Sequence, residues 1–89
     1  MDFEWDEEKR RGNLEKHGID FLDACQVFDG RPRIDADSPR EGEQRFQTTA
    51  QLGSRFVTVV WMERAGVVRV ISARRARDGE ERAHRQLFR

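Results

Sequence analysis

Hydrophobic residues recur along this chain with two different spacings, and the change of spacing predicts the order of its elements. From Phe21 to Phe28 they recur every three or four positions, which is the spacing of one face of a helix. After residue 31 the period shortens to two, as expected for strands whose side chains point alternately to opposite faces. The chain is therefore expected to begin with helices and to continue as a β-sheet.

Two short helices joined by a sharp turn are expected before residue 30. Asp6 is a good N-cap for the first helix, and Gly18 suits its left-handed end. The second helix starts at Asp20 and buries the face that runs from Phe21 to Phe28. The first helix has little hydrophobic surface and is expected to be mostly solvated, and "FEW" ahead of it would suit a short edge strand.

The strands follow in the second half of the chain. The most hydrophobic strand is expected at residues 55–62, and the turn "ERAG" folds it back onto an antiparallel strand at residues 67–74. Further strands are expected at "QRFQTTAQL" and, as a short strand, at "RPRIDAD". The residues expected in the core are Phe21, Ala24, Phe28, Val60 and Val70.

A short closing helix is expected at "DGEERAHRQLFR", docked through Ala83, Leu87 and Phe88. These elements predict one α+β domain over residues 1–89. Its expected architecture is a compact antiparallel sheet of three to four strands with two N-terminal helices and a short C-terminal helix.

Composition adds limits on the class of protein. The charged fraction is 38%, yet six Phe and two Trp argue against disorder. The single Cys25 excludes an internal disulfide framework and suits a reducing compartment. No hydrophobic run approaches the roughly 18 residues of a membrane span, and no signal-peptide pattern opens the chain, so a cytoplasmic protein with no membrane contact is expected.

The net charge is zero, but the charge is unevenly spread. Residues 1–30 carry nine acids and four bases, a balance of −5, whereas residues 69–89 carry three acids and seven bases, a balance of +4. The two ends either neutralise each other or leave a local anion site, and the pattern alone fits both. Only Lys9 and Lys16 among the seventeen bases are lysines, and the planar donor fork of arginine suits phosphate.

Two charged clusters follow the strongest strands. Glu63 and Arg64 end the first strand, and "ARRAR", residues 73–77, ends the second. Because the two strands are antiparallel, the clusters are expected at opposite ends of the hairpin unless a twist or a bulge reunites them. A solvated pair in a turn, and arginines that neutralise the acidic first third, are the ordinary explanations of the same residues.

The two histidines and one cysteine lack the spacing of a metal site, so no metal and no cofactor are expected. His17 lies at the end of the first helix, where a protonated ring is favourable without any catalytic role. His84 is expected on a surface helix. The residues by themselves predict an anion-binding α+β domain.

Several sequence blocks carry a resemblance to a known family. The blocks "FEWDEEK", "NLEKHGIDFLDACQVFD", "GEQRF", "VVWMERAG" and "RVISARRA" resemble, in that order, those of BrnT-type toxins of bacterial type II toxin–antitoxin modules. This resemblance spans residues 3–77 and implies a RelE-like fold, with the helices packed at one side of an antiparallel sheet. It also implies metal-independent RNA cleavage that inhibits translation and growth. The implied partner is a ribbon-helix-helix antitoxin, which binds operator DNA and forms a hetero-oligomer with the toxin.

The resemblance implies residue roles as well. The catalytic residues implied are Arg64, Arg74, Glu63 and His17. The substrate-binding residues implied are Lys9, Arg75 and Arg77. Related sequences often carry a tyrosine in a helix near the end, whereas this chain has none and offers "EERAHR" there. Either His84 substitutes for the tyrosine or the tail has no catalytic part. A non-catalytic basic interaction module and a DNA-binding regulatory subunit remain the alternatives.

Overall fold

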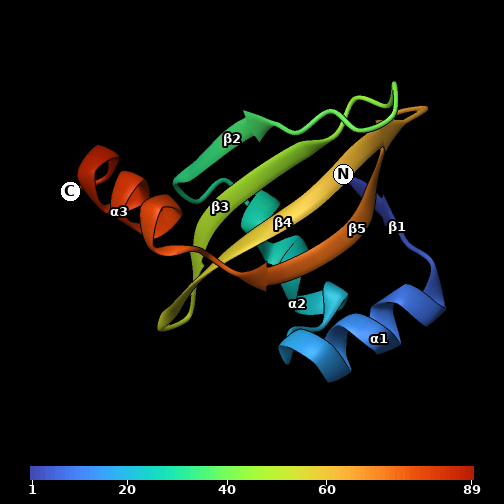
Figure 1. The fold of residues 1–89 in the computed structure, drawn as a ribbon, viewed down its shortest axis with the longest axis horizontal. Helices are drawn as coiled ribbons and strands as arrows, with labels where there is room; N and C mark the ends of the chain where they lie inside the picture. The colour runs from blue at the N-terminus through green and yellow to red at the C-terminus, as the bar shows by residue number, and fades with distance from the viewer.

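Five strands form one sheet in the order β1-β5-β4-β3-β2, and helices lie against both of its faces (Figure 1). The computed structural model describes all of residues 1–89. In chain order the elements are β1 (Asp2–Glu4), α1 (Glu7–His17), α2 (Phe21–Ala24), the 3-10 helix η1 (Cys25–Phe28), β2 (Arg33–Asp37), β3 (Phe46–Leu52), β4 (Arg55–Arg64), β5 (Val67–Arg75) and α3 (Asp78–Leu87).

The predicted hairpin is confirmed. β4 and β5 pair antiparallel, with Arg64 opposite Val67, and the two-residue turn Ala65–Gly66 joins them. Both turn residues have positive φ, 53° for Ala65 and 80° for Gly66, as a type I′ turn requires. Glycine adopts this conformation without strain, whereas Ala65 incurs a steric cost through its Cβ.

The predicted sheet of three to four antiparallel strands was wrong in number and in direction. The sheet has five strands, and β1 at its edge pairs in parallel with the start of β5, where Phe3 lies opposite Val68. The "FEW" segment thus contributes the expected edge strand, and "RPRIDAD" forms β2 at the other edge. A parallel pair requires a long crossover connection, and the helices and strands from α1 to β4 provide it between β1 and β5.

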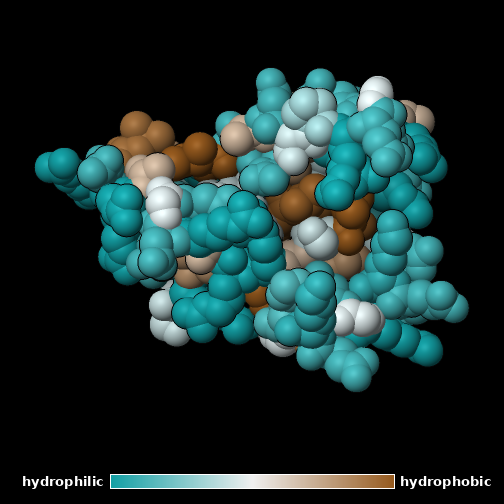
Figure 2. Space-filling model, in the orientation of Figure 1, coloured by the Kyte–Doolittle hydropathy of each residue, from teal (hydrophilic) through white to brown (hydrophobic).

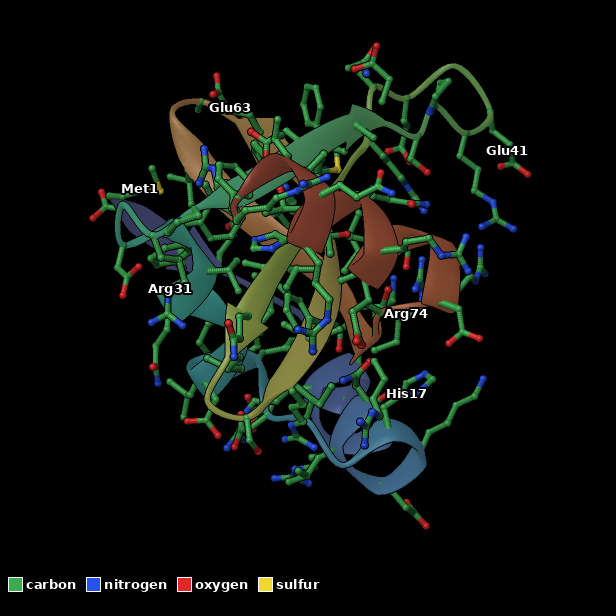
Figure 3. The ribbon with its side chains drawn as sticks, turned by 90° about the vertical axis from the view of Figure 1, so that its left-hand side faces the viewer. Met1, His17, Arg31, Glu41, Glu63 and Arg74 are labelled. Atoms are coloured by element: carbon green, nitrogen blue, oxygen red, sulfur yellow. The ribbon has the colours of Figure 1, made fainter.

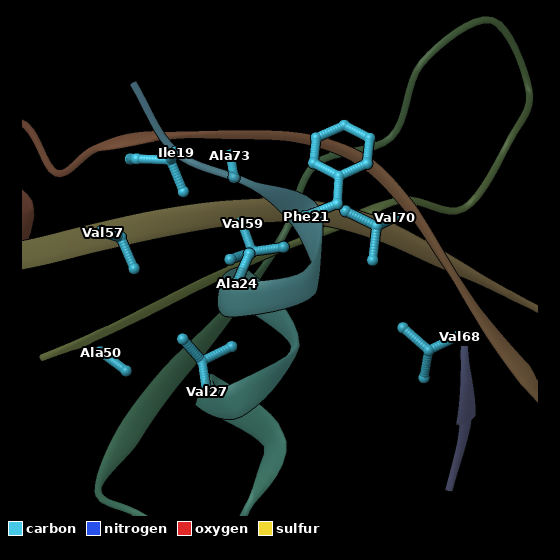
Figure 4. Close-up of a cluster of buried hydrophobic side chains, with 10 residues drawn as sticks. All are labelled: Ile19, Phe21, Ala24, Val27, Ala50, Val57, Val59, Val68, Val70 and Ala73. Carbon is cyan, nitrogen blue, oxygen red and sulfur yellow. The ribbon is translucent and has the colours of Figure 1, made fainter. Parts of the chain in front are cut away.

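The core lies between the sheet and the segment that contains α2 and η1 (Figure 4). The predicted second helix is divided: α2 has four residues, and the remainder winds into the tighter η1. Phe21, Ala24 and Val70 are buried as predicted. The fully or nearly fully buried hydrophobic residues on this face are Ile19, Phe21, Ala24, Val27, Ala50, Val57, Val59, Val68, Val70 and Ala73.

Two of the predicted core residues are only partly buried. Phe28 lies at the margin of the core, where its ring packs edge-on against Trp61 at 5.1 Å between centroids and lies 5.0 Å from the guanidinium carbon of Arg33. Val60 points to the opposite face of the sheet, because Val57 and Val59 occupy the core positions of β4. The hydrophobic run of β4 therefore places side chains on both faces of the sheet.

Helix α3 lies on the face of the sheet opposite α2, so the implied placement of the helices at one side of the sheet was wrong (Figure 1). Its contacts also differ from the prediction, since Leu87 is 65% and Phe88 40% exposed, and Ala83 is exposed too. His84, expected at the surface, is buried and packs against the ring of Phe56 at 5.1 Å. Its Nε2–H donates to the carbonyl oxygen of Pro32 at 3.0 Å.

Helix α1 packs against the edge of β5 beyond the point where β1 ends. Asn13 is the buried residue of this otherwise solvated helix, with 8% of its surface exposed. Its amide accepts from the backbone N–H of Ala73 at 3.1 Å and donates to the Ala73 carbonyl at 2.8 Å and to the Ile19 carbonyl at 2.9 Å. One side chain thus completes the hydrogen bonds that a neighbouring strand would have supplied to β5.

A β-bulge changes which residues of β5 face the core. Val60 pairs with Ser72 and Trp61 pairs with Val70, which leaves Ile71 without a partner on β4. The core-facing residues of β5 are therefore Val68 and Val70 before the bulge and Ala73 after it. As a result Arg75 follows Ala73 on the α2 face, whereas Arg74 points to the α3 face.

Candidate functional site

The two charged clusters lie at opposite ends of the sheet. Arg64 pairs with Val67, whereas Arg74 pairs with Thr58, so seven positions of β5 separate them. At roughly 3.3 Å per residue this is about 20 Å, and the bulge does not bring the two arginines together. Figure 3 shows Glu63 on the far side of the molecule from His17, with Arg74 between them and nearer to His17. Arg64 and Arg74 therefore cannot contact the same phosphodiester.

Several cations gather at the end of β5. His17 lies one helical turn, roughly 6 Å, beyond Asn13, and Arg75 lies two residues, about 7 Å, beyond Ala73, to which Asn13 is bonded. Arg55 at the start of β4 donates to the carbonyl of Gly18 at 3.4 Å and so ties the end of α1 to the same place. We call the group His17, Arg55, Arg75 and Arg77 the basic end.

Lys9 lies farther from the basic end. It is exposed one helical turn before Asn13, on the side of α1 that faces β5. His17 lies one turn after Asn13 on that same side, so roughly 12 Å of helix separates it from Lys9. Lys9 can therefore flank a ligand of the basic end but does not belong to that group.

The charges of the basic end are not neutralised by the acidic first third of the chain. One ion pair joins the acidic first third to residues 69–89. It connects Arg69 to Glu4 at 3.8 Å and lies near the start of β5, away from the basic end. Three other acids of the first third, Glu7, Asp20 and Asp29, pair with arginines of residues 10–31, as Asp20 does with Arg10 at 2.9 Å, and the rest form no ion pair. Arg75 and Arg77 form no ion pair, so the charge asymmetry leaves an open cationic surface.

Arg74 differs from its neighbours because its charge is paired. Its Nη1 and Nη2 donate to the two carboxylate oxygens of Glu80 at 2.8 and 3.0 Å. The same carboxylate accepts from the backbone N–H of Arg77 at 2.8 Å and from the hydroxyl of Thr58 at 3.0 Å. These bonds, led by those from Arg74, lower the pKa of Glu80 from 4.5 to about 2. Glu80 thus fixes the start of α3 and the backbone of Arg77 to the sheet.

Replacement of Glu80 by Gln is expected to lower the free energy of unfolding by about 3 kcal/mol at pH 7, since each unit of pKa shift corresponds to about 1.4 kcal/mol. The pKa of the folded state is the lower one, so this contribution is complete above the unfolded value of 4.5 and is lost as pH falls towards 2. Urea unfolding of wild type and variant at several pH values should show the difference shrinking in acid.

A matched control for this measurement is Glu81→Gln. Glu81 pairs with Arg85 at 3.1 Å, but both side chains are well exposed, at 40% and 64%. Exposed pairs of this spacing contribute about 0.5 kcal/mol or less. Equal losses in the two variants, or a Glu80 loss that does not depend on pH, would contradict the structural role of the Arg74–Glu80 pair.

A hollow beside α3 is lined by the end of that helix and by the segment that precedes β2. Its volume is about 420 Å³, and its lining includes Asp29, Arg31 and His84. These polar groups are already engaged, because Arg31 pairs with Asp29 at 2.7 Å and donates to the Gln51 carbonyl at 2.8 Å. His84 is bonded to Pro32, so it is not available as a substitute for the tyrosine of related sequences.

Sequence reasoning missed three residues that build the basic end. Asn13, Arg55 and Glu80 had no assigned role, although each holds a candidate residue or its backbone in place. Asn13 could have been noticed in the sequence. Helix α1 has almost no hydrophobic surface through which to pack, so a polar side chain must hold it against the sheet. Arg55 left none, because its partner Gly18 lies far away in the sequence. Glu80 left a local signal, since it stands three residues after the N-cap of α3 and six after Arg74.

No group of three or more His, Cys, Asp or Glu side chains is arranged so that it could hold a metal ion. None of the helices is both long enough and hydrophobic enough to cross a membrane.

Comparison with known protein families adds a direct result. Residues 5–80 match the family model of BrnT, described as a ribonuclease toxin of type II toxin–antitoxin systems. The chain belongs to the BrnT family. BrnT proteins are ribonuclease toxins, and their type II systems pair the toxin with an antitoxin partner. No curated protein matches the chain. The match covers α1, the basic end and the whole sheet except β1.

Proposed function

We propose that this BrnT protein is a metal-independent endoribonuclease whose reaction centre is the basic end. The observation that carries the proposal is the presence of a histidine and unpaired arginines at the same end of β5 in a member of a ribonuclease toxin family. Growth inhibition would follow from the loss of translated RNA in the cytoplasm.

The reaction is an attack of the ribose 2′-oxygen on the adjacent phosphorus. The 2′-hydroxyl loses its proton, the new P–O2′ bond forms, the P–O5′ bond breaks, and the leaving 5′-oxygen takes up a proton. The products are a 2′,3′-cyclic phosphate and a 5′-hydroxyl end. Histidine is the side chain that ordinarily changes its protonation near neutral pH, so His17 is the proposed proton-transfer group.

The arginines stabilise the charge that develops on the phosphorane. Arg75 and Arg77 have no carboxylate partner, so their donors are free for non-bridging oxygens of the phosphate. Arg74 does not contact the phosphate in this proposal, because its donors are bonded to Glu80. It acts indirectly, since Glu80 in turn holds the backbone of Arg77. Lys9 is proposed as a flanking contact to the RNA backbone.

Glu63 and Arg64 fall outside this centre. They lie at the hairpin turn about 20 Å from Arg74, and a side chain of arginine or glutamate cannot span that distance. The proposal therefore assigns neither of them to proton transfer or to phosphate binding in the reaction. The roles that the family resemblance implied for them are replaced by His17 for the proton and by Arg75 and Arg77 for the charge.

The partner proposed for the toxin is a ribbon-helix-helix antitoxin. The type II assignment supports a protein antitoxin. Ribbon-helix-helix proteins dimerise to fold, so a hetero-oligomer with toxin at both sides of an antitoxin dimer is expected, with operator DNA bound through the antitoxin.

Cleavage of RNA by the purified toxin tests the proposed function. We expect cleavage of naked RNA, or of messenger RNA on translating ribosomes, at the same rate with and without EDTA, and product ends that carry a 2′,3′-cyclic phosphate. Cleavage that stops in EDTA and returns with added Mg²⁺ would contradict the proposed chemistry. Absence of cleavage with both substrates would contradict the assignment of an active ribonuclease.

A further inference from the structure

The hollow beside the end of α3 is the largest cavity of the domain, and the proposed reaction does not use it. Its volume of about 420 Å³ lies within the range of ligand sites in proteins, roughly 300–1,000 Å³. Its lining includes Phe88 at the end of α3, Gln51 of β3, and Arg31 from the segment before β2. Three separate segments of the chain therefore meet around a space of ligand size.

The charges at the hollow balance each other. Asp29 and Arg31 both line it, and they pair with each other at 2.7 Å. A phosphate inside the hollow would meet the Asp29 carboxylate and a guanidinium whose charge is already neutralised. A neutral ligand with a polar edge therefore fits the hollow better than an anion does.

Some hydrogen-bonding groups at the hollow remain unused. Arg31 has five N–H donors, of which two are bonded to Asp29 and one to the carbonyl oxygen of Gln51. The side-chain amide of Gln51 is exposed and forms no hydrogen bond. The unused donors of Arg31, together with the donor and the acceptor of this amide, match the mixed donors and acceptors on the edge of a nucleobase.

The ring of Phe88 offers a stacking surface at the hollow. It is 40% exposed, and the ring of His84 supports it with 4.8 Å between centroids. His84 is itself fixed by the ring of Phe56 and by its bond to Pro32. Figure 2 shows hydrophobic atoms gathered at this end of α3. Exposed aromatic rings on a rigid support are the usual platforms for the bases of single-stranded RNA.

A cationic side chain links the hollow to the basic end. The guanidinium carbon of Arg85 lies 4.7 Å from the centre of the Phe56 ring, and the Arg85 side chain is 64% exposed. Phe56 directly follows Arg55 of the basic end, and its carbonyl oxygen accepts from the N–H of Ala76 at 2.9 Å. Arg85 also precedes Phe88 by three residues. RNA held at the basic end can therefore pass Arg85 on its way to the hollow.

The length of α3 sets which nucleotide reaches the hollow. Arg77 and Phe88 cap the two ends of α3, eleven residues or roughly 16 Å apart along the helix. Figure 3 likewise shows Arg31 and Arg74 on opposite sides of α3. This separation exceeds the reach of one nucleotide, so a base in the hollow belongs to a neighbour of the cleaved nucleotide. The pair of Arg85 with Glu81 is exposed and weak, and a phosphate on this path can displace the carboxylate.

We propose that the hollow holds one unpaired base of the RNA substrate, stacked on Phe88 and hydrogen-bonded at its edge by Arg31 and Gln51. Arg85 contacts the RNA backbone between this base and the basic end. The inference rests on RNA as the ligand of the proposed function, but it does not require that the RNA be cleaved. It makes the substrate a single strand, because a base within a duplex cannot enter the hollow.

Binding of a single-stranded 2′-O-methyl RNA tests the inference, because this oligonucleotide lacks the 2′-hydroxyl nucleophile and stays intact. Measured by fluorescence anisotropy, Phe88→Ala should weaken binding about 10-fold, and Phe88→Trp should retain it. Leu87→Ala is the matched control. Leu87 is 65% exposed beside Phe88 but does not line the hollow, so its loss should leave the affinity unchanged.

An abasic oligonucleotide of the same length separates the base from the backbone. Wild type and Phe88→Ala should bind it equally, because the stacked base is absent. Arg85→Ala should weaken binding of both oligonucleotides and lower the salt dependence of log K by about one unit of slope. Wild type should favour one of the four 2′-O-methyl homopolymers, and Gln51→Leu should reduce that preference about threefold.

The outcomes separate the inference from the proposed function. Equal affinities of Phe88→Ala and wild type for the base-bearing strand would overturn the inference, as would an equal loss on the abasic strand or no binding by wild type. Loss of antitoxin affinity in Phe88→Ala, with RNA affinity unchanged, would assign the hollow to the antitoxin instead. A toxin that fails to cleave RNA but binds bases through Phe88 would overturn the proposed function alone. Should Phe88→Ala melt early, the exposed Gln51→Leu variant decides.

Discussion

Alanine in place of Arg75 is expected to lower the rate of RNA cleavage about 10²–10³-fold while the unfolding transition stays where it is. Arg75 forms no ion pair and is exposed, so the folded domain loses no contact with it. The transition state loses a cation that is anchored at the end of a strand. Arg75→Lys should also lose most of the activity, because a single ammonium cannot supply the planar pair of donors that arginine offers to phosphate.

Arg64→Ala is the control for this prediction, since it removes the same exposed and unpaired charge from the opposite end of the hairpin. We expect it to cleave RNA at the wild-type rate. His17→Ala should lose activity as Arg75→Ala does. Loss of cleavage in Arg64→Ala with full activity in Arg75→Ala would move the reaction centre to the hairpin turn and to Glu63.

Replacement of Asn13 by Leu is expected to lower the free energy of unfolding by about 2–4 kcal/mol. Leucine has the same branched side-chain skeleton but no hydrogen-bonding groups. The N–H and carbonyl of Ala73 and the carbonyl of Ile19 would each lose a buried partner. Glu15→Leu introduces the same residue on the exposed side of α1 and should change stability little, which isolates the effect of the buried bonds.

Asn13→Asp gives a sharper test because its effect depends on pH. The ionised carboxylate of this variant would be an additional acceptor facing two carbonyl oxygens, so the folded state raises its pKa above the unfolded value of about 3.9. The protonated form can still donate, so its stability is fully present below about pH 3.9 and is lost as pH rises through the folded pKa. Chemical unfolding from pH 3 to 7 should show the variant losing stability relative to wild type. A constant difference would contradict the bonding of Asn13.

The strongest local signals in the sequence predicted their elements correctly. The run from Arg55 and the run from Val67, with Ala65–Gly66 between them, could form little else than a hairpin. Asp6 caps α1 through its side chain, and Gly18 ends the helix in the left-handed conformation, as the sequence indicated. Each of these features depends on neighbours within a few residues, which is why a sequence alone can reveal it.

The missed features depend on contacts between distant residues. A three-residue strand such as β1 has too few positions to show a period, and its parallel partner lies more than sixty residues away. The face that α3 covers is decided by Glu80 and His84, whose partners are Thr58 and the carbonyl of Pro32. Composition marks these residues as polar but cannot indicate that they are the ones that dock the helix.

The candidate site divides in the same way. The charge pattern correctly drew attention to the arginines that follow β5, but it could not distinguish the paired Arg74 from the unpaired Arg75 and Arg77. That distinction arises from the bulge in β5 and from the ion pair of Arg74 with Glu80. The alternation of hydrophobic and polar residues predicts neither of them.

The bulge at Ile71 gives β5 a place where the chain can change length. Loss of one residue from a regular strand turns every later side chain to the other face of the sheet. Ile71 has no partner on β4, so its deletion would leave Arg74 opposite Thr58 and Arg75 opposite Val57, each on its present face. Relatives that are one residue shorter here could therefore keep the same arginine free for substrate. An alignment should place their gap at the bulge, because a gap at position 73 would turn Arg74 to the α2 face and bring Arg75 opposite Thr58, and so exchange the paired and the free guanidinium.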